Sequence, residues 1–387
     1  MKLLGKLLYV CRVLSLPVTV SIVLLVLAVS MTVSCISLFV FGLYTSLGYT
    51  VKPIGEDMIV IYSGSALTPY TGLIPRSVEY RLRHVLESEN VWSEVVLPAL
   101  VNGKPIIVRG IDTKTLCRVV GDMLCREVVE KPFTAVVGVD AASYLGIAEG
   151  EEVVLYPLFT AIPLKLRIVG VVDVENPYRG EILVSLSFAQ KLRGVDRDTV
   201  SMVKVVYRSR SEVVQILRSM GLKGAEANKQ LTPLYLVERI AITLVSGASK
   251  PIAMTSFSYI DMFTKRFGFS RDMLTIATSI LAILSSFTVY TIGRSCIVLH
   301  LDRLRVLSEV GVSRKRIALH ITMITAPIVT IAILCGIAIA MNISKMFSLY
   351  IFGYSIEPCV DLITVAIELT SFLTLYILGI VRSEVVS

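Results

Sequence analysis

The sequence predicts an α+β membrane protein with four transmembrane helices and a large mixed α/β extracytoplasmic domain between helices 1 and 2. The chain has 387 residues, of which 54% are hydrophobic and 18% are charged. Its apolar residues are concentrated in four blocks, which is typical of a multi-pass membrane protein. A long stretch of mixed polarity separates the first block from the second, and its length suits one or two soluble domains.

Each apolar block is long enough to cross a bilayer, which takes about 20 residues. Residues 13–51 contain no charged side chain and predict helix 1 with a stalk that continues beyond the membrane. Residues 256–300 predict a second stalk and helix 2, and residues 317–344 predict helix 3. Residues 358–387 predict helix 4 and a tail, with residues 345–357 as the external loop before it.

The basic residues indicate which side of the membrane each segment occupies. Next to the expected spans, basic residues lie in residues 1–12 and in the loop at residues 301–316, and Arg382 follows the fourth block; the positive-inside rule places all three segments in the cytoplasm. Residues 1–12 are expected to form a surface helix. A cleaved signal peptide is the alternative for the first block, but its apolar run is too long and lacks a clear cleavage site. We therefore expect a cell-membrane protein with both termini cytoplasmic and residues 52–255 outside.

Apolar residues in the outer domain recur at both strand and helix periods, which predicts a mixed α/β fold. Strands are expected at residues 58–62, 91–96, 106–110, 153–156, 164–172, 182–184 and 202–207. Helices are expected at residues 77–87, 113–120, 141–145, 188–192 and 211–220. The section at residues 128–137 gives no firm prediction.

Cys117 and Cys125 are the only two of the seven cysteines that fall in the outer domain. Outside the cytoplasm they would pair if their Cα atoms lie within bridging distance. The alternative is two small apolar side chains on one helical face. A possible disulfide is therefore expected here, and no cysteine or histidine spacing indicates a metal site.

The loop at residues 301–316 has a local pattern of its own. Leu301, Leu304 and Leu307 recur at helical spacing, and Gly311 is where a helix would stop in a left-handed conformation. Ser313 is placed to cap a new helix that begins at Arg314. The pattern predicts a helix, a tight turn and a second helix that runs into the membrane.

Two regions carry a resemblance to a known family. Residues 135–220 resemble the extracytoplasmic core domain of MacB-type ABC transporter permeases. The similar stretches are AVVGVDAASYLGIAEGEEV, LRIVGVVD, EILVSLSFAQKL and MVKVVYRSRSEVVQILRSM. The loop and third helix, LRVLSEVGVSRKRIALHITMITAPIVTIAILCGIAIA, resemble the FtsX-like permease signature, in which a hydrophobic helix, a glycine, a small residue and a basic cluster precede a span.

The resemblance implies a permease subunit that is driven by a separate cytoplasmic ABC-type ATPase. The sequence itself contains no GxxxxGK[ST] phosphate loop. A second permease chain, identical or different, and membrane lipid are the other expected partners. The basic cluster has an alternative role as an anchor to anionic headgroups. The residues expected to couple to the ATPase are Arg303, Leu304, Arg305, Leu307, Val310, Gly311, Val312, Arg314, Lys315 and Arg316.

The expected activity is export or extraction of a lipid, lipoprotein, peptide or drug through movement of the outer domain. The alternative is a signalling subunit that activates an extracytoplasmic partner such as a cell-wall hydrolase. The chain has only three histidines, so a histidine-based triad or metal cluster is not expected in the outer domain. We expect no enzyme activity in this chain, no cofactor and no nucleic-acid partner.

Glu368 is the one acidic residue near the middle of an expected span. A carboxyl group there should face a protein interior or bond to hydroxyl groups. Thr370, Ser371 and Thr374 lie on the same segment. A role in packing, including at a dimer interface, is favoured over a role in substrate or proton movement.

Overall fold

The computed structural model describes residues 16–49, 58–63, 72–86, 90–206, 251–255, 271–309, 311–347 and 349–383. The chain forms two compact units, which are described separately below. The span unit comprises Met1–Thr45, Phe269–Ser348 and Glu357–Ser387. The outer unit comprises Ser46–Gly268 together with the short segment Leu349–Ile356.

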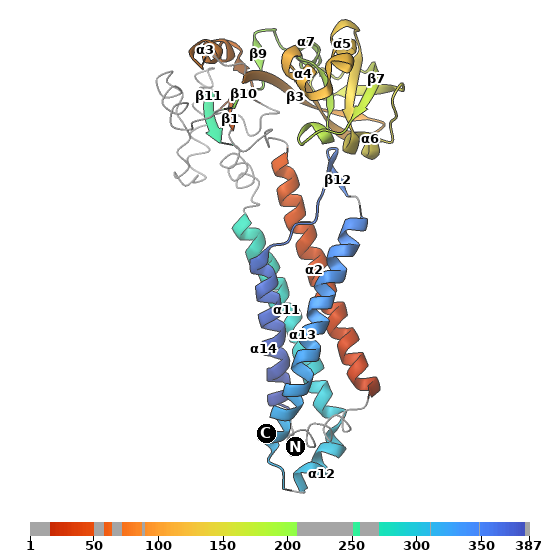
Figure 1. The fold of residues 1–387 in the computed structure, drawn as a ribbon, viewed down its shortest axis with the longest axis vertical. Coiled ribbons are helices and arrows are strands. Elements are labelled where there is room, and N and C mark those ends of the chain that lie inside the picture. Colours follow the sequence, from red (N-terminus) through yellow and green to blue (C-terminus); the bar gives the residue numbers. More distant parts are fainter. Residues whose placement is uncertain are drawn as a thin grey trace. The chain divides into compact units, whose positions relative to one another are not determined.

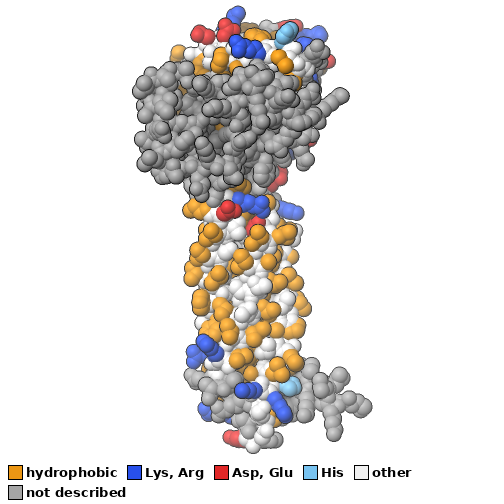
Figure 2. Space-filling model, turned by 90° about the vertical axis from the view of Figure 1, so that its left-hand side faces the viewer, with side chains coloured by type: hydrophobic (Ala, Val, Ile, Leu, Met, Phe, Trp, Pro, Cys, Tyr) orange, Lys and Arg blue, Asp and Glu red, His pale blue; other side chains and the backbone are white. Residues whose placement is uncertain are grey.

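Four long helices and the short helix α12 (Leu301–Glu309) make up the described part of the span unit (Figure 1). All four are long and apolar enough to cross a membrane. Hydrophobic side chains cover their outer faces in a broad band (Figure 2). They are α2 (Leu16–Tyr49), α11 (Arg271–Val298), α13 (Arg314–Met346) and α14 (Leu362–Val381).

Glycines allow the helices of the span unit to approach closely. A Cβ atom on Gly379 of α14 would lie 2.3 Å from the carbonyl oxygen of Tyr290 in α11. One on Gly293 of α11 would lie 2.6 Å from the carbonyl oxygen of Tyr376 in α14. The pair α11 and α14 is therefore held backbone to backbone, a packing mode that small residues permit in membranes.

The fourth helix begins at a well-defined cap. The Asp361 carboxylate accepts hydrogen bonds from the Thr364 backbone N–H at 3.1 Å and from its hydroxyl at 2.9 Å. It also pairs with Arg271 at the start of α11, at 3.2 Å. A side-chain oxygen at this position satisfies an otherwise unpaired N–H of the first turn. The cap and the ion pair join the ends of α11 and α14.

The outer unit is built on a nine-stranded mixed sheet with the order β11-β1-β10-β3-β4-β8-β5-β7-β6. Most neighbours are antiparallel, and the pairs β4–β8 and β5–β7 are parallel. The strands are β1 (Met58–Ser63), β3 (Val91–Val101), β4 (Lys104–Ile111), β5 (Thr134–Gly138), β6 (Glu152–Pro157), β7 (Leu164–Val172), β8 (Ile182–Ser185), β10 (Met202–Val206) and β11 (Pro251–Thr255).

Side chains alternate between the two faces of this sheet, as strand geometry requires. On β3, Val91, Val95 and Leu97 join the larger apolar cluster, whereas Trp92 joins the smaller one on the opposite face. The larger cluster includes residues of α3 (Ser77–Leu86), α6 (Val139–Leu145) and α7 (Leu186–Arg193). The smaller cluster includes residues of α4 (Thr113–Val120) and α5 (Asp122–Glu130), with Tyr178 of the short helix η1 (Tyr178–Gly180).

Four small strands complete the described chain. The pair β2 (Ile74–Pro75) and β9 (Thr199–Val200) lies in the outer unit, as do β12 (Tyr350–Ile351) and β13 (Tyr354–Ser355). The last two form a hairpin within the segment expected to be an external loop, and strands of two residues are too short to show a periodic pattern.

Most expected elements of the outer domain have a counterpart in the structure, often with longer bounds. β3 continues to Val101 beyond the expected end at residue 96. The section at residues 128–137 holds the end of α5 and β5 except for its last residue, Gly138. Its periodicity was mixed because a turn at Phe133, with φ of 59°, separates the two elements. The surface helix at residues 1–12, the helix at residues 211–220 and the stalk at residues 256–270 lie outside the described residues.

Candidate functional site

The loop between α11 and α13 forms a helix, a turn and a second helix. Helix α12 (Leu301–Glu309) is followed by Gly311, whose φ of 89° is the left-handed conformation that glycine tolerates best. Ser313 occupies the cap position of α13, and its carbonyl accepts the N–H of Arg316 at 2.9 Å. Its side chain makes no capping hydrogen bond, contrary to our expectation. The backbone geometry alone begins the helix.

Leu304 anchors this loop from within. It is 1% exposed and belongs to the apolar cluster of the span unit, together with Ile297 of α11 and Ile321 of α13. We expected Leu304 among the residues that contact a partner, but it is not available for such contact. Helical spacing identifies an apolar face without showing whether a neighbouring helix of the same chain covers it. Leu304 therefore fixes α12 to the two spans.

The exposed face of the loop combines basic and apolar side chains. Val306 of α12 is 58% exposed, and Val312 in the turn is also exposed. Arg305, Lys315 and Arg316 are exposed beside them. Apolar contacts with a basic rim suit a protein interface. Of the remaining expected coupling residues, Gly311 is exposed, whereas the side chains of Arg303, Leu307 and Arg314 and the whole of Val310 lie outside the described residues.

Two further exposed apolar residues come just before α12 in the chain and were not among the expected coupling residues. Val298 ends α11 with 46% exposure, and Leu299 follows with 64%. The sequence signal for them was hidden, because residues at the end of an apolar block look like part of the span. With Val306 and Val312 they form a set of four exposed apolar side chains, which we call the loop face together with Arg305, Lys315 and Arg316.

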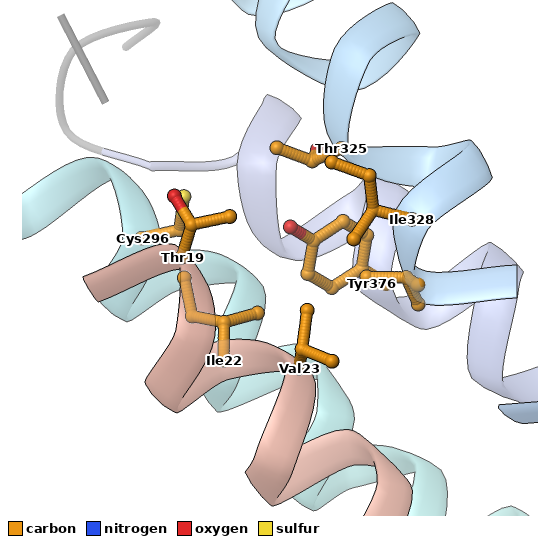
Figure 3. A pocket seen from close by; sticks show the side chains of 8 residues that line it. Thr19, Ile22, Val23, Cys296, Thr325, Ile328 and Tyr376 are labelled. Carbon is orange, nitrogen blue, oxygen red and sulfur yellow. The ribbon is translucent and has the colours of Figure 1, made fainter. Parts of the chain in front are cut away.

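A small pocket lies between the four helices, near the last turn of α11 (Figure 3). Thr19, Ile22 and Val23 of α2 line one side, and Thr325 and Ile328 of α13 line another. Cys296 of α11 and the ring of Tyr376 of α14 complete it. The helices are therefore less tightly packed here than at the glycine contacts.

Glu368 joins three helices of the span unit. Its carboxyl group on α14 lies 2.7 Å from the Ser30 hydroxyl and 2.9 Å from the Ser34 hydroxyl, both on α2. Ser30 also lies 3.1 Å from the carbonyl oxygen of Ile333 on α13. Glu368 is 1% exposed. Its hydroxyl partners come from another helix, whereas Thr370 and Ser371 on its own helix bond to backbone carbonyls.

In the outer unit, Cys117 of α4 and Cys125 of α5 form a disulfide, with their Cα atoms 4.8 Å apart. The bond connects two short helices that cover the smaller apolar cluster, and Cys125 is fully buried. A covalent link between such short helices restricts the unfolded chain and so favours their docked arrangement.

A buried ionic network crosses the middle of the sheet. Arg109 of β4 donates to Glu94 of β3 and, at 2.6 Å from Nη2, to Glu181 just before β8. Lys204 of β10 pairs with Glu94 at 2.9 Å. All four side chains are at most 1% exposed, and their formal charges cancel. A neutral, fully bonded set is the condition under which buried charges are tolerated.

Neutral donors complete the network. The Tyr178 hydroxyl and the Trp92 indole N–H each donate to Glu94 Oε1 at 2.9 Å. The hydroxyl of Tyr354, from the β12–β13 hairpin, donates to Glu181. We did not expect this network from the sequence. Its signal was a single charged residue inside each of three apolar strands, at Glu94, Arg109 and Lys204.

The network sets the pKa values of its members in opposite directions. Burial alone would raise the pKa of Glu94, but Lys204 and Arg109 lower it to about 2. Burial raises the pKa of Glu181, and Arg109 offsets this only in part. Burial lowers the pKa of Lys204 despite its pairing with Glu94. Desolvation and opposite charge are the two competing causes throughout.

No group of three or more His, Cys, Asp or Glu side chains within the described residues is arranged to hold a metal ion.

Comparisons with known proteins show similarity to solved structures, two of which are described here. No protein-family model matches the sequence, and no curated protein matches it. The periplasmic region of MacB from Actinobacillus actinomycetemcomitans is 15% identical, with a TM-score of 0.32 over 53% of this chain and 92% of that one. The extracellular domain of the noncanonic ABC-type transporter YknZ from Gram-positive bacteria is 13% identical, with a TM-score of 0.31 over 51% of this chain and 100% of that one.

Proposed function

We propose that this chain is the permease subunit of an ABC transporter and that it converts the motion of a separate ATPase into movement of its outer domain. The observation that carries the proposal is the loop face. It presents Val306 and Val312 beside basic residues, while Leu304 beneath it is packed against α11 and α13. A force applied to this face would act on two spans at once, because the loop is both anchored to them and continuous with them.

The internal packing of the span unit supports this reading. α11 and α14 are in contact through Gly293 and Gly379 and through the Arg271–Asp361 pair, so they would move together. We infer that the spans tilt as rigid rods and that the work is delivered outside, on a lipid, lipoprotein, peptide or drug that is exported or extracted. A second permease chain, identical or different, would complete the transporter.

The test is copurification of an ABC-type ATPase with the full chain in detergent. Reversing three charges of the loop face, with Arg305→Glu, Lys315→Glu and Arg316→Glu, is expected to reduce recovery of the ATPase at least tenfold, since rim charges govern association. The matched control reverses three exposed basic residues of the outer unit, Lys114, Arg118 and Arg126. This control should leave recovery of the ATPase unchanged.

A second variant separates docking from attachment to lipid headgroups. Val306→Asp leaves every basic residue in place, so attraction to anionic lipid is nearly preserved. If the loop face docks an ATPase, this variant should also lose the ATPase and its ATP turnover. The proposal is wrong if no ATPase copurifies with the unaltered chain, or if both variants retain it.

A further inference from the structure

The hairpin Leu349–Ile356 occupies an unusual place in the chain. It connects α13, which ends at Met346, to α14, which begins at Leu362. It nevertheless belongs to the outer unit, together with the nine-stranded sheet. The two spans on either side of it thus share one short segment that is packed into the outer domain.

Two glycines allow the hairpin to contact the outer domain closely. Gly353, at the turn, has a φ of 93°, and a Cβ atom there would lie 2.2 Å from the carbonyl oxygen of Gly180. A Cβ atom on Gly180 would in turn lie 2.5 Å from the ring of Tyr354. Any other residue at either position would push the hairpin away, so the backbone itself is shaped for this contact.

Polar and aromatic contacts hold the hairpin on both strands. Ser355 donates to Asp140 of α6 at 3.0 Å, and its carbonyl accepts the Ser46 hydroxyl at 3.2 Å. Tyr350 packs on Tyr144 of α6 with ring centroids 5.5 Å apart. The hairpin lies beside α6 in Figure 1.

Tyr354 connects the hairpin to the ionic network. Its side chain is 1% exposed, and its hydroxyl donates to the same Glu181 carboxylate that Arg109 holds. A continuous series of hydrogen bonds then runs from Tyr354 through Glu181 and Arg109 to Glu94, and ends at Trp92. A buried carboxylate that loses one donor becomes less stable, so Glu181 is sensitive to where the hairpin sits.

We propose that the β12–β13 hairpin is a mechanical link through which α13 and α14 act on the centre of the outer sheet. Tyr354 is the positioning residue, and a shift of Tyr354 moves the paired side chains of Glu181 and Arg109. Withdrawal of the Tyr354 hydroxyl shifts Glu181 and Arg109, and strands β8, β4 and β3 follow because these residues lie on or next to them. This link goes beyond the proposed function, since it requires no ATPase to be present.

The experiment uses the full chain in lipid nanodiscs and the variant Tyr354→Phe, which removes one hydroxyl and preserves the ring. The matched control is Tyr350→Phe, the same change on the same hairpin at a half-buried ring. Two signals are followed by mass spectrometry, one on each side of the link. The first is amide hydrogen exchange in β8. The second is alkylation by N-ethylmaleimide of Cys359, a half-buried free thiol just before α14.

Tyr354→Phe is expected to speed exchange in β8 about tenfold, the scale of a lost hydrogen bond to a charged acceptor. It should also speed alkylation of Cys359 by about threefold or more, because α14 is released together with the hairpin. Tyr350→Phe should change neither. Adding Glu181→Gln to Tyr354→Phe should have less effect than the sum of the two changes, since both act on one contact.

Three results would overturn the link. The first is a change in β8 without a change at Cys359, which would make the hydrogen bond a local contact of the outer domain. The second is an equal effect of Tyr350→Phe, and the third is no effect of Tyr354→Phe on either signal. Failure to find an ATPase would leave this measurement intact, so the two proposals fail separately.

Discussion

The guanidinium group of Arg109 lies between the carboxylates of Glu94 and Glu181, and none of the three side chains is exposed to solvent. The three residues come from separate segments, β3, β4 and the residue before β8. The native strand order therefore brings these three charges together. We infer that the network helps to specify the order β10-β3-β4-β8, in addition to any stability that it supplies.

Removing Arg109 should be far more costly than removing an arginine from the surface. Arg109→Met leaves two buried carboxylates with one cation, and we expect it to lower the free energy of unfolding of the outer unit by about 3–5 kcal/mol. The control is Arg179→Met, because Arg179 is paired with Asp140 at 3.0 Å but is 38% exposed. That change should cost below about 1 kcal/mol. Denaturant unfolding of the full chain, followed by fluorescence, measures the loss of stability in both variants. Equal losses of stability would contradict the role of Arg109 as the central cation of the buried network.

Acid should weaken the outer unit over a defined range of pH. The pKa of Glu94 is about 2 in the folded chain and has an ordinary value of 4.5. Ionised Glu94 therefore stabilises the fold above pH 4.5, and this contribution of about 3 kcal/mol is lost as the pH falls towards 2. Glu181 opposes part of this, since its pKa is raised. The free energy of unfolding, measured between pH 6 and pH 2, should fall over this range. The Glu94→Gln variant should show a weaker dependence on pH. The same dependence on pH in both proteins would contradict the role of Glu94.

The Trp92 side chain offers a native probe for these measurements. It is the only tryptophan in the chain, and its indole N–H donates to Glu94. Its fluorescence should change when Glu94 is protonated or when the network opens, without any added label.

Breaking the disulfide should destabilise the outer unit moderately. Replacing Cys117 and Cys125 together by alanine removes a link that closes a short loop, and we expect a loss of about 2–3 kcal/mol. Thiol labelling of the denatured chain, with and without prior reduction, tests the bond directly. Reduction should expose two additional thiols. An equal number of labelled thiols before and after reduction would show that the bond is absent.

Replacing Glu368 by a neutral side chain of the same size should destabilise the protein less than shortening the side chain to alanine. Glu368→Gln keeps an oxygen acceptor for Ser30 and Ser34 and should change stability by below about 1 kcal/mol. Glu368→Ala removes the acceptor and leaves a cavity, and should cost about 2–4 kcal/mol. Thermal unfolding in detergent compares the two, with Thr370→Val on the same helix as the control. Comparable losses for Gln and Ala would point to a requirement for the carboxyl group itself.

The sequence was most informative where a single segment determines its own structure. The apolar length of each block predicts a membrane-spanning helix, and β7 has the bounds that its apolar residues predict. The turn at Gly311 could likewise be predicted from local pattern. These features depend on backbone propensity and hydrophobicity within about ten to thirty consecutive residues.

Features that depend on which segments become neighbours could not be predicted. Glu94, Arg109 and Lys204 look like isolated charges until β10, β3 and β4 lie side by side. Leu304 and Val306 are two residues apart on one short helix, and only packing against α11 and α13 shows that the first is buried and the second exposed. The contacts of Tyr354 beside Gly180 could not be predicted for the same reason, because they join segments more than 170 residues apart.

The pairing of β1 with β11 has a mechanical consequence. These are the first and last described strands of the outer sheet before the chain reaches α11, and they run antiparallel, with Ile59 opposite Thr255. The chain therefore enters β1 and leaves β11 at the same end of the pair. Tension that separates these two connections would break the backbone hydrogen bonds one after another, as in unzipping, whereas tension that moves them together would load none of them. The β1–β11 pair thus resists a pull that moves both of these ends together, and it is weakest against a pull that separates them.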